Sequence, residues 1–284
     1  MEHGRVLVTG AEGQLGRDLC RLLPDAVGLG HKELSITDPE AVRAAVRDAG
    51  AEIVCNCAAY NAVDAAERDP GVAQAVNADG PAIVAEACRE AGARLVHFST
   101  NYVFSGERDG PATEADEPDP RSAYARSKLE GERRVVGILP SALVVRCAGL
   151  YGLAGSAVKG GSFPARILER ARSDAPLRVV DDQWLNPTFT RDLAAGVVVL
   201  LGRDLEGAVH LVADGCCTWW EFATEALGLA GVDRAVEPIS TESLAAPAPR
   251  PRHGCLASRR VPPLRGWREG LAEFVREAVA TGRS

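Results

Sequence analysis

The chain alternates between short apolar runs and longer stretches in which apolar residues recur every three or four positions. In the first half, runs that predict strands occupy residues 5–9, 26–29, 53–58, 94–99 and 142–146. Patterns that predict helices occupy residues 15–23, 72–91 and 124–136, and another helix is expected to begin at Asp38-Pro39 with Asp38 as its cap. Strands alternating with helices indicate βαβ units, so we expect an α/β fold with a parallel sheet.

The second half of the chain is less regular. Helices are predicted over residues 163–172, 191–201, 219–229 and 270–281, and strands over 177–180 and 209–212. The Pro-rich segment 245–252 predicts an extended loop. We therefore expect a larger domain made of residues 1–150 plus about 177–206, and a smaller C-terminal lobe made of about 151–176 plus 207–284.

Composition narrows the class of protein. The chain has 284 residues, 46% of them hydrophobic and 25% charged, which suits a globular enzyme with a sizeable core. The net charge of -7 argues against a nucleic-acid partner, which normally requires a basic face. No apolar run reaches the roughly 18 residues of a membrane span, and no leader pattern precedes the first strand. We expect a cytoplasmic monomer or homodimer without a membrane partner.

Eight cysteines stand at positions 20, 55, 57, 88, 147, 216, 217 and 255. They form no C-x-x-C pair and no Cys/His cluster with zinc spacing. We therefore expect free thiols, mostly buried, in a reducing compartment, and no metal site.

The segment after the first predicted strand carries three glycines, in the pattern Gly10-x-x-Gly13-x-x-Gly16. Such a loop between a strand and a helix permits a tight turn and a close approach of a pyrophosphate to the helix N-terminus. It predicts a dinucleotide-binding, doubly wound sheet. The residues of this loop that are expected to contact the cofactor are Gly10, Glu12, Gly13, Gln14, Leu15 and Gly16.

The corner after the second strand bears on the choice of cofactor. A carboxylate for the ribose 2′-hydroxyl usually stands about 20 residues beyond the glycines, yet residues 28–32 contain none. His31 or Lys32 could instead meet a 2′-phosphate, which favours NADPH and leaves NADH possible. A solvated loop at this corner is an equally good interpretation.

Tyr124 and Lys128 stand four residues apart, on one face of a predicted helix. A phenol is a poor proton-transfer group at neutral pH, and a nearby ammonium lowers its pKa. Ser99 and Thr100 end a preceding strand, where ligands bind in a doubly wound sheet. Each feature alone has a plain alternative, a surface helix or a Ser/Thr turn. Together, the glycine loop, the hydroxyl residues at the end of the strand and the helix with Tyr124 and Lys128 predict hydride-transfer chemistry.

These motifs resemble the dTDP-4-dehydrorhamnose reductase family of the extended short-chain dehydrogenase/reductase superfamily. The matching segments span residues 5 to about 195 and comprise 9–16, 56–64, 99–104, 124–132, 146–152, 182–188 and 192–194. The resemblance implies a Rossmann-type cofactor domain, a small substrate-binding lobe and a place in deoxysugar biosynthesis. It also implies reduction, by NADPH or NADH, of the C4 ketone of a nucleotide-linked 4-keto-6-deoxy sugar.

Site residues follow from the resemblance by position. It implies that Thr100, Tyr124 and Lys128 are catalytic. Beyond the glycine loop, the residues expected to contact the cofactor are His31, Lys32, Asp38, Ala58, Ala59, Tyr60, Ser99, Tyr124 and Lys128. The residues expected to border the sugar are Val63, Tyr102, Val103, Gly149 and Gln183.

Two positions depart from the family pattern. Gly149 stands where relatives often have a tryptophan against the sugar, so the pocket is expected to be reshaped. Asp18 stands where some relatives have a glutamate that holds a metal between subunits, so we expect no metal.

Other functions are possible on the same scaffold. A 4,6-dehydratase needs an acid and a base, and the amide of Asn101 and the phenol of Tyr102 after Thr100 cannot supply the matched carboxyl pair. A 4-epimerase uses the same Thr, Tyr and Lys and stays open. So does a regulatory subunit resembling the β subunit of methionine adenosyltransferase, which would bind NADP(H) without consuming it.

Overall fold

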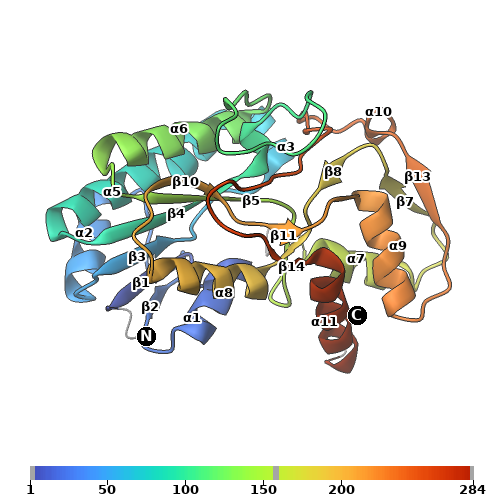
Figure 1. Ribbon diagram of the computed structural model, residues 1–284, viewed down its shortest axis with the longest axis horizontal. Helices are drawn as coiled ribbons and strands as arrows, with labels where there is room; N and C mark the ends of the chain where they lie inside the picture. The colour runs from blue at the N-terminus through green and yellow to red at the C-terminus, as the bar shows by residue number, and fades with distance from the viewer. Residues whose placement is uncertain (1–3, 156–159, 282–284) are drawn as a thin grey trace.

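A parallel sheet forms the centre of the structure, a computed structural model that describes residues 4–155 and 160–281 (Figure 1). Its six described strands lie in the order β2-β1-β3-β4-β5-β10. They are β1 (Val6–Thr9), β2 (Val27–Leu29), β3 (Ile53–Asn56), β4 (Arg94–Thr100), β5 (Leu143–Cys147) and β10 (Gly207–His210). All pair in parallel, which confirms the predicted α/β fold with a doubly wound sheet.

Helices cover both faces of this sheet, because successive strand residues point to opposite sides. Val8 faces a core shared with Leu19 of α1 (Gln14–Leu22), and α8 (Thr190–Leu201) packs beside α1. Leu7, its neighbour in β1, joins the opposite core. That face is covered by α2 (Pro39–Asp48), α5 (Gly80–Ala91) and α6 (Ala123–Ile138).

The strand order creates a crevice beyond β1 and β3. From β1 the chain crosses to β2 on one side, whereas β3 leads to β4 on the other. Connections leaving the two strands therefore diverge at their carboxyl ends, which is where doubly wound sheets bind ligands. The glycine loop follows β1 and residues 57–60 follow β3, so both border this crevice.

The predicted helix over residues 72–91 consists of three segments. These are α4 (Pro70–Gln74), the π-helical η1 (Ala75–Asp79) and α5. Pro81 has no N–H to donate to the carbonyl of Asn77, so the regular ladder cannot continue through this point. A short helix that the pattern did not predict, α3 (Val63–Arg68), precedes them.

A second core lies beside the sheet. It is built around aromatic rings in mutual contact, including Tyr151, Phe189, Phe222 and Phe274. Its helices are α7 (Phe163–Arg170), α9 (Trp219–Leu229) and α11 (Trp267–Ala280), and the short, unburied α10 (Thr241–Leu244) lies outside it. Its paired strands are β6 (Leu150–Tyr151) with β9 (Thr188–Phe189), β7 (Leu177–Val180) with β13 (Val236–Ile239), β8 (Trp184–Leu185) with β12 (Cys217–Thr218), and β11 (Ala213–Asp214) with β14 (Leu264–Gly266).

Two strands lie on the other side of the expected domain division. β7, assigned from the sequence to the larger domain, pairs with β13 beside the second core. β10, assigned to the smaller lobe, pairs with β5 in the central sheet. The hydrophobic pattern shows that a segment is a strand, but it does not show which sheet supplies the partner.

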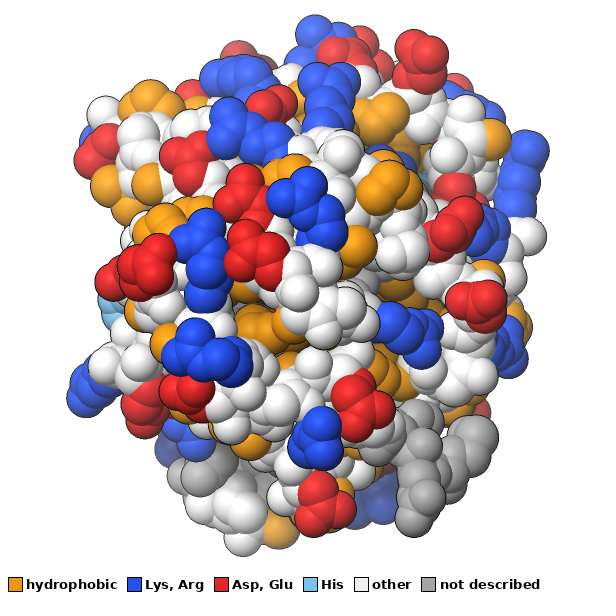
Figure 2. Space-filling view, turned by 90° about the vertical axis from the view of Figure 1, so that its left-hand side faces the viewer, with side chains coloured by type: hydrophobic (Ala, Val, Ile, Leu, Met, Phe, Trp, Pro, Cys, Tyr) orange, Lys and Arg blue, Asp and Glu red, His pale blue; other side chains and the backbone are white. Residues whose placement is uncertain are grey.

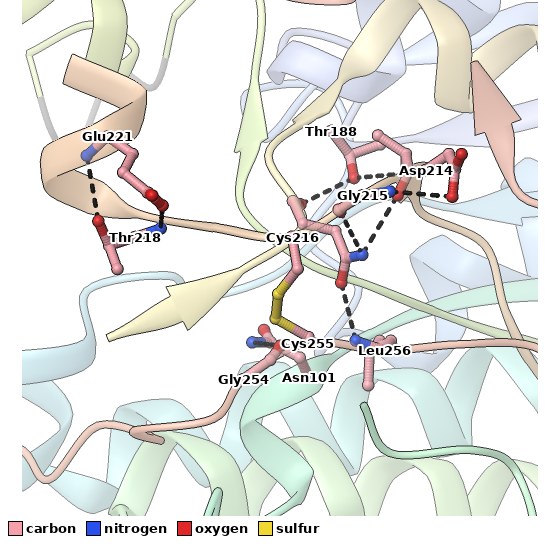
Figure 3. Close-up of a disulfide and its surroundings, with 12 residues drawn as sticks. Asn101, Thr188, Asp214, Gly215, Cys216, Thr218, Glu221, Gly254, Cys255 and Leu256 are labelled. Carbon is pink, nitrogen blue, oxygen red and sulfur yellow. Dashed lines mark hydrogen bonds between the residues drawn. A yellow bond between two sulfur atoms is a disulfide. The ribbon is translucent and has the colours of Figure 1, made fainter. Parts of the chain in front are cut away.

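The expectation of eight free thiols is wrong for one pair, since Cys216 and Cys255 form a disulfide (Figure 3). Cys216 follows β11, and Cys255 lies in the chain that returns from the Pro-rich segment. The pair is 39 residues apart, and only the tertiary fold brings the two segments together. The other six cysteines are free.

Charges of both signs mix on the surface at the left-hand side of the view in Figure 1. Figure 2 shows this face, with basic and acidic side chains interspersed rather than gathered by sign. On α2, Arg43 pairs with Glu40 and with Glu90 of α5. Among the described residues, no helix is both long and apolar enough to cross a bilayer.

Candidate active site

The glycine loop makes a cradle at the start of α1. Gly10 has φ +64°, and a side chain on Gly16 would collide with the Gly10 carbonyl. The N-cap of α1 is Gly13, whose lack of a side-chain cap leaves the first N–H groups pointing into the crevice. Gln14 Oε1 is buried and has no hydrogen-bond partner among the described residues. The N–H groups would hold a pyrophosphate, and Gln14 Oε1, an acceptor, would take a hydrogen bond from a donor such as a ribose hydroxyl.

The corner after β2 does contain a carboxylate, which the sequence analysis missed. Glu33 folds back so that Oε2 accepts a 2.6 Å hydrogen bond from the Gly30 N–H. His31 and Lys32 extend from the same turn and are exposed. The signal was a carboxylate four residues beyond Leu29, the last residue of the strand, rather than at the strand's end.

Asp38, also expected to contact the cofactor, caps the helix that follows this corner. Its Oδ1 accepts the N–H groups of Glu40 and Ala41, at 3.0 and 3.1 Å, as the N-cap of α2. The capping role that the sequence predicted is confirmed. Contact of Asp38 with a cofactor stays a prediction.

Tyr124 and Lys128 lie on the first turns of α6, which begins at the Ser122 cap. Both are buried, with 8% and 2% of their surface exposed. Tyr124 lies next to Thr100, at the end of β4, on the wall of one cavity. Lys128 Nζ donates to the Phe98 carbonyl at 2.7 Å. The structure therefore brings together the three residues that the sequence singled out.

The pKa values at this site are set mainly by burial. Burial raises the pKa of Tyr124 above its usual value, and the hydrogen bond from Thr100 offsets only part of this. Burial also lowers the pKa of Lys128 to about 8. We expected the ammonium to lower the phenol pKa, but in this structure burial dominates that pKa and raises it.

A cavity of about 240 Å³ contains this group. Ser99 lines it, and Ser99 Oγ is buried without a partner among the described residues. The other predicted residues that line it are Gly13, Gln14, Leu15, Gly16, Ala59, Val63, Thr100, Tyr102, Tyr124, Lys128 and Gly149. The lining residues that the sequence analysis did not assign to the site are Cys57, Asn61, Phe98, Asn101, Cys147, Leu150 and Trp219.

A larger cavity of about 700 Å³ adjoins the first, and the two share five lining residues: Gln14, Val63, Tyr102, Leu150 and Trp219. Gln183 lines the larger cavity. So do four arginines, Arg166, Arg170, Arg178 and Arg250, which make its wall suited to an anion. Together the cavities have room for a dinucleotide end and an extended anionic substrate.

Val103 and Gly149, both expected to border the sugar, lie in different surroundings. Val103 is fully buried against Phe104, Leu129 and Leu256, so it is not placed to touch a substrate. The turn after β4 directs Tyr102 toward the cavities and Val103 into the core. Gly149 does line the smaller cavity, with φ +55°.

Asn77 supports the site from the π-helical η1, a role that no sequence motif predicted. Its side chain accepts from the Tyr60 N–H at 2.8 Å and donates to the Tyr60 carbonyl at 3.0 Å. It also donates to Ser127 Oγ in α6 at 3.1 Å. One amide thus fixes the loop after β3 relative to the helix of Tyr124. Tyr60 and Ala58 are both expected at the cofactor. Asn77 holds the backbone of Tyr60, and the backbone of Ala58 packs against Gly10.

A doubly wound sheet, an uncapped glycine loop and a buried Tyr-x-x-x-Lys helix define the class of short-chain dehydrogenases and reductases. The family model described as RmlD substrate binding domain matches residues 4–280, so the chain belongs to this family.

Several relatives match over nearly their whole length. A dTDP-4-dehydrorhamnose reductase of Streptomyces griseus is 42% identical, with 95% of this chain and 92% of the relative covered. A probable dTDP-4,6-dihydroxy-2-methyloxan-3-one 4-ketoreductase of Streptomyces antibioticus is 40% identical, with 97% and 96% covered. The crystal structure of a dTDP-4-dehydrorhamnose reductase from Bacillus anthracis in complex with NADP superposes with a TM-score of 0.92 at 34% identity, covering 97% of this chain and all (100%) of the other.

Proposed function

We propose that the protein reduces the C4 ketone of a nucleotide-linked 4-keto-6-deoxy sugar, dTDP-4-dehydrorhamnose or a close relative, with NADPH as the favoured cofactor and NADH possible. The observation that carries this proposal is the buried Thr100-Tyr124-Lys128 group, which lies between a glycine loop and an arginine-lined cavity. Relatives named as reductases of such sugars, one of them solved with NADP, support it.

The residues present fit a dinucleotide. The N–H groups at the start of α1 would hold its pyrophosphate, and the unpartnered Gln14 Oε1 and Ser99 Oγ face the same cleft. When bound, the reduced nicotinamide supplies a hydride to the ketone carbon. The chain's own part is to hold the carbonyl in place and to deliver one proton.

The proton comes from Tyr124. Because burial raises its pKa, the phenol stays protonated at neutral pH and can donate to the carbonyl oxygen as that oxygen becomes an alkoxide. Thr100 donates a hydrogen bond to the same oxygen and orients it. Lys128 carries the positive charge that stabilises the phenolate left behind, until solvent returns the proton.

The amide of Asn101 bears on the competing dehydratase reaction. Its Nδ2 donates to the Gly254 carbonyl at 2.7 Å, which makes it a structural tie to the C-terminal segment. A dehydratase needs a carboxylic acid at this kind of position. We therefore favour reduction. Cytoplasmic location and a monomeric or homodimeric state remain predictions.

The test is oxidation of NADPH and of NADH, followed at 340 nm, with a dTDP-4-dehydro-6-deoxy sugar prepared in situ. Tyr124→Phe removes the donated proton and keeps the ring, so we expect at least a 100-fold lower kcat, in line with general-acid contributions of about 10²–10⁴. Unchanged NADPH affinity of the variant is the control. Wild-type protein that binds NADPH but consumes none would refute the reductase function and favour the regulatory subunit.

A further inference from the structure

A chain of three side chains links the two parts of the molecule beside the site. Arg250 lies in the extended segment that follows α10, and Asp64 lies in the first turn of α3. Arg250 Nη2 donates to Asp64 Oδ2 at 2.8 Å. The guanidinium also lies next to the phenol of Tyr102, on the wall of the larger cavity. Arg250 therefore joins α3 to the turn that carries Tyr102.

Tyr102 in turn contacts both Thr100 and Tyr124. Its backbone N–H donates to Thr100 Oγ1 at 3.2 Å. Its ring meets the Tyr124 ring edge to face, with centroids 5.7 Å apart and an interplanar angle of 83°. A shift of Tyr102 would therefore be transmitted to Tyr124 through direct ring contact.

The geometry of Arg250 suits it to hold a ring in place. Only 17% of its side chain is exposed, and its Nη1 donates to the Ala248 carbonyl at 2.9 Å. The Ala248 N–H closes the loop by donating to Asp64 Oδ1 at 3.2 Å. Two partners thus fix the planar guanidinium next to the Tyr102 phenol, with a rigid fork geometry that the single nitrogen of a lysine does not provide.

We propose that Arg250 is a positioning residue, which uses Asp64 as an anchor to hold Tyr102 against Tyr124 and so sets the position of the proton donor. This inference rests on the proposed function. It gives the Pro-rich segment of residues 245–252 a part in the rate of the chemical step. Arg250 also lines the larger cavity, so the rival role is binding of the substrate's diphosphate.

The positioning role and the diphosphate-binding role of Arg250 predict changes in different kinetic constants. If Arg250 positions Tyr102, Arg250→Met lowers kcat about 10- to 100-fold, the scale of small misplacements of a reacting group, with little change in KM. Tyr102→Phe removes the hydroxyl that Arg250 holds and keeps the ring, so it lowers kcat in the same direction. The double variant is then no worse than Arg250→Met alone, because both changes break one link. Arg252→Met, on the same segment and exposed, is the matched control with unchanged kinetics.

The outcomes separate cleanly. A raised KM with wild-type kcat in Arg250→Met, or additive effects of the two changes, would overturn the proposal. If Arg250→Met does not fold, Tyr102→Phe with wild-type kcat overturns it equally. If the wild type reduces no sugar, the proposed function fails, and crystal structures of wild type and Arg250→Met decide this inference: a displaced Tyr102 ring supports it and an unmoved ring refutes it.

Discussion

Lys128 is expected to cost the protein stability, so replacing it should stabilise the fold even as it abolishes the activity. The ammonium is 2% exposed and makes one hydrogen bond, to the Phe98 carbonyl. Burial lowers its pKa from 10.5 to about 8, which means that the fold disfavours the charged form. Lys128→Met keeps the length of the side chain and removes the charge.

The size of the effect follows from linkage. The fall in the Lys128 pKa from 10.5 to about 8 corresponds to a loss of about 3 kcal/mol in the free energy of unfolding, at 1.36 kcal/mol per pKa unit. Loss of the hydrogen bond to Phe98 returns about 1 kcal/mol. We therefore expect Lys128→Met to raise the free energy of unfolding at pH 7 by about 2 kcal/mol.

The sign of the pH dependence is fixed as well. Between pH 8 and 10.5 the unfolded wild type binds more protons than the folded protein, so wild-type stability rises with pH in that window. The variant lacks this group, and its advantage should shrink as the pH rises from 7 to 9.5. Urea unfolding of both proteins at the two pH values, without added cofactor, measures this. A variant no more stable than wild type at pH 7, or an advantage that grows with pH, would refute the reasoning.

Two further predictions concern stability. Glu132 and Arg146 form a buried ion pair with a separation of 2.6 Å, so Glu132→Gln leaves Arg146 without its counter-charge. The change should lower the free energy of unfolding by about 3–5 kcal/mol. Arg178→Met, which breaks an exposed ion pair, should cost less than about 1 kcal/mol, and equal losses in urea unfolding would contradict the prediction. Cys255→Ser should cost about 2–4 kcal/mol without reductant, for a loop closed over 39 residues. Dithiothreitol should lower the wild-type melting temperature toward that of the variant and leave the variant unchanged, so a wild type insensitive to it argues against the disulfide.

Local patterns in the sequence predicted the catalytic group, because its members depend on short-range rules. Tyr124 and Lys128 share a helix face by their spacing, and Thr100 lies where a parallel strand ends. Val103 was wrongly placed at the sugar, because the turn after β4 points adjacent side chains in opposite directions. Homology by position could not show that reversal.

The missing site residues come from segments far away in the sequence. Arg250 meets Asp64 across 186 residues, and Asn77 reaches Ser127 across 50. Trp219 lines both cavities, although it stands at the start of a helix whose pattern indicates only core packing. No spacing rule covers such pairs, because the tertiary fold alone decides which loops face the crevice. Cys216 and Cys255 escaped prediction for the same reason.

The position of β10 limits how this protein can be re-engineered. The chain leaves the central sheet after β5, builds β6 to β9 beside the second core, returns for α8 and β10, and departs again for β11 to α11. Apart from Gln14, Tyr102 and residues 62–65, the walls of the larger cavity therefore derive from two stretches, within residues 150–183 and 219–250, on either side of α8 and β10. Exchanging substrate preference between relatives requires transplanting both stretches together. A cassette that begins after β10 would leave the first stretch behind, and one that begins at β6 would carry α8 and the sheet strand β10 with it.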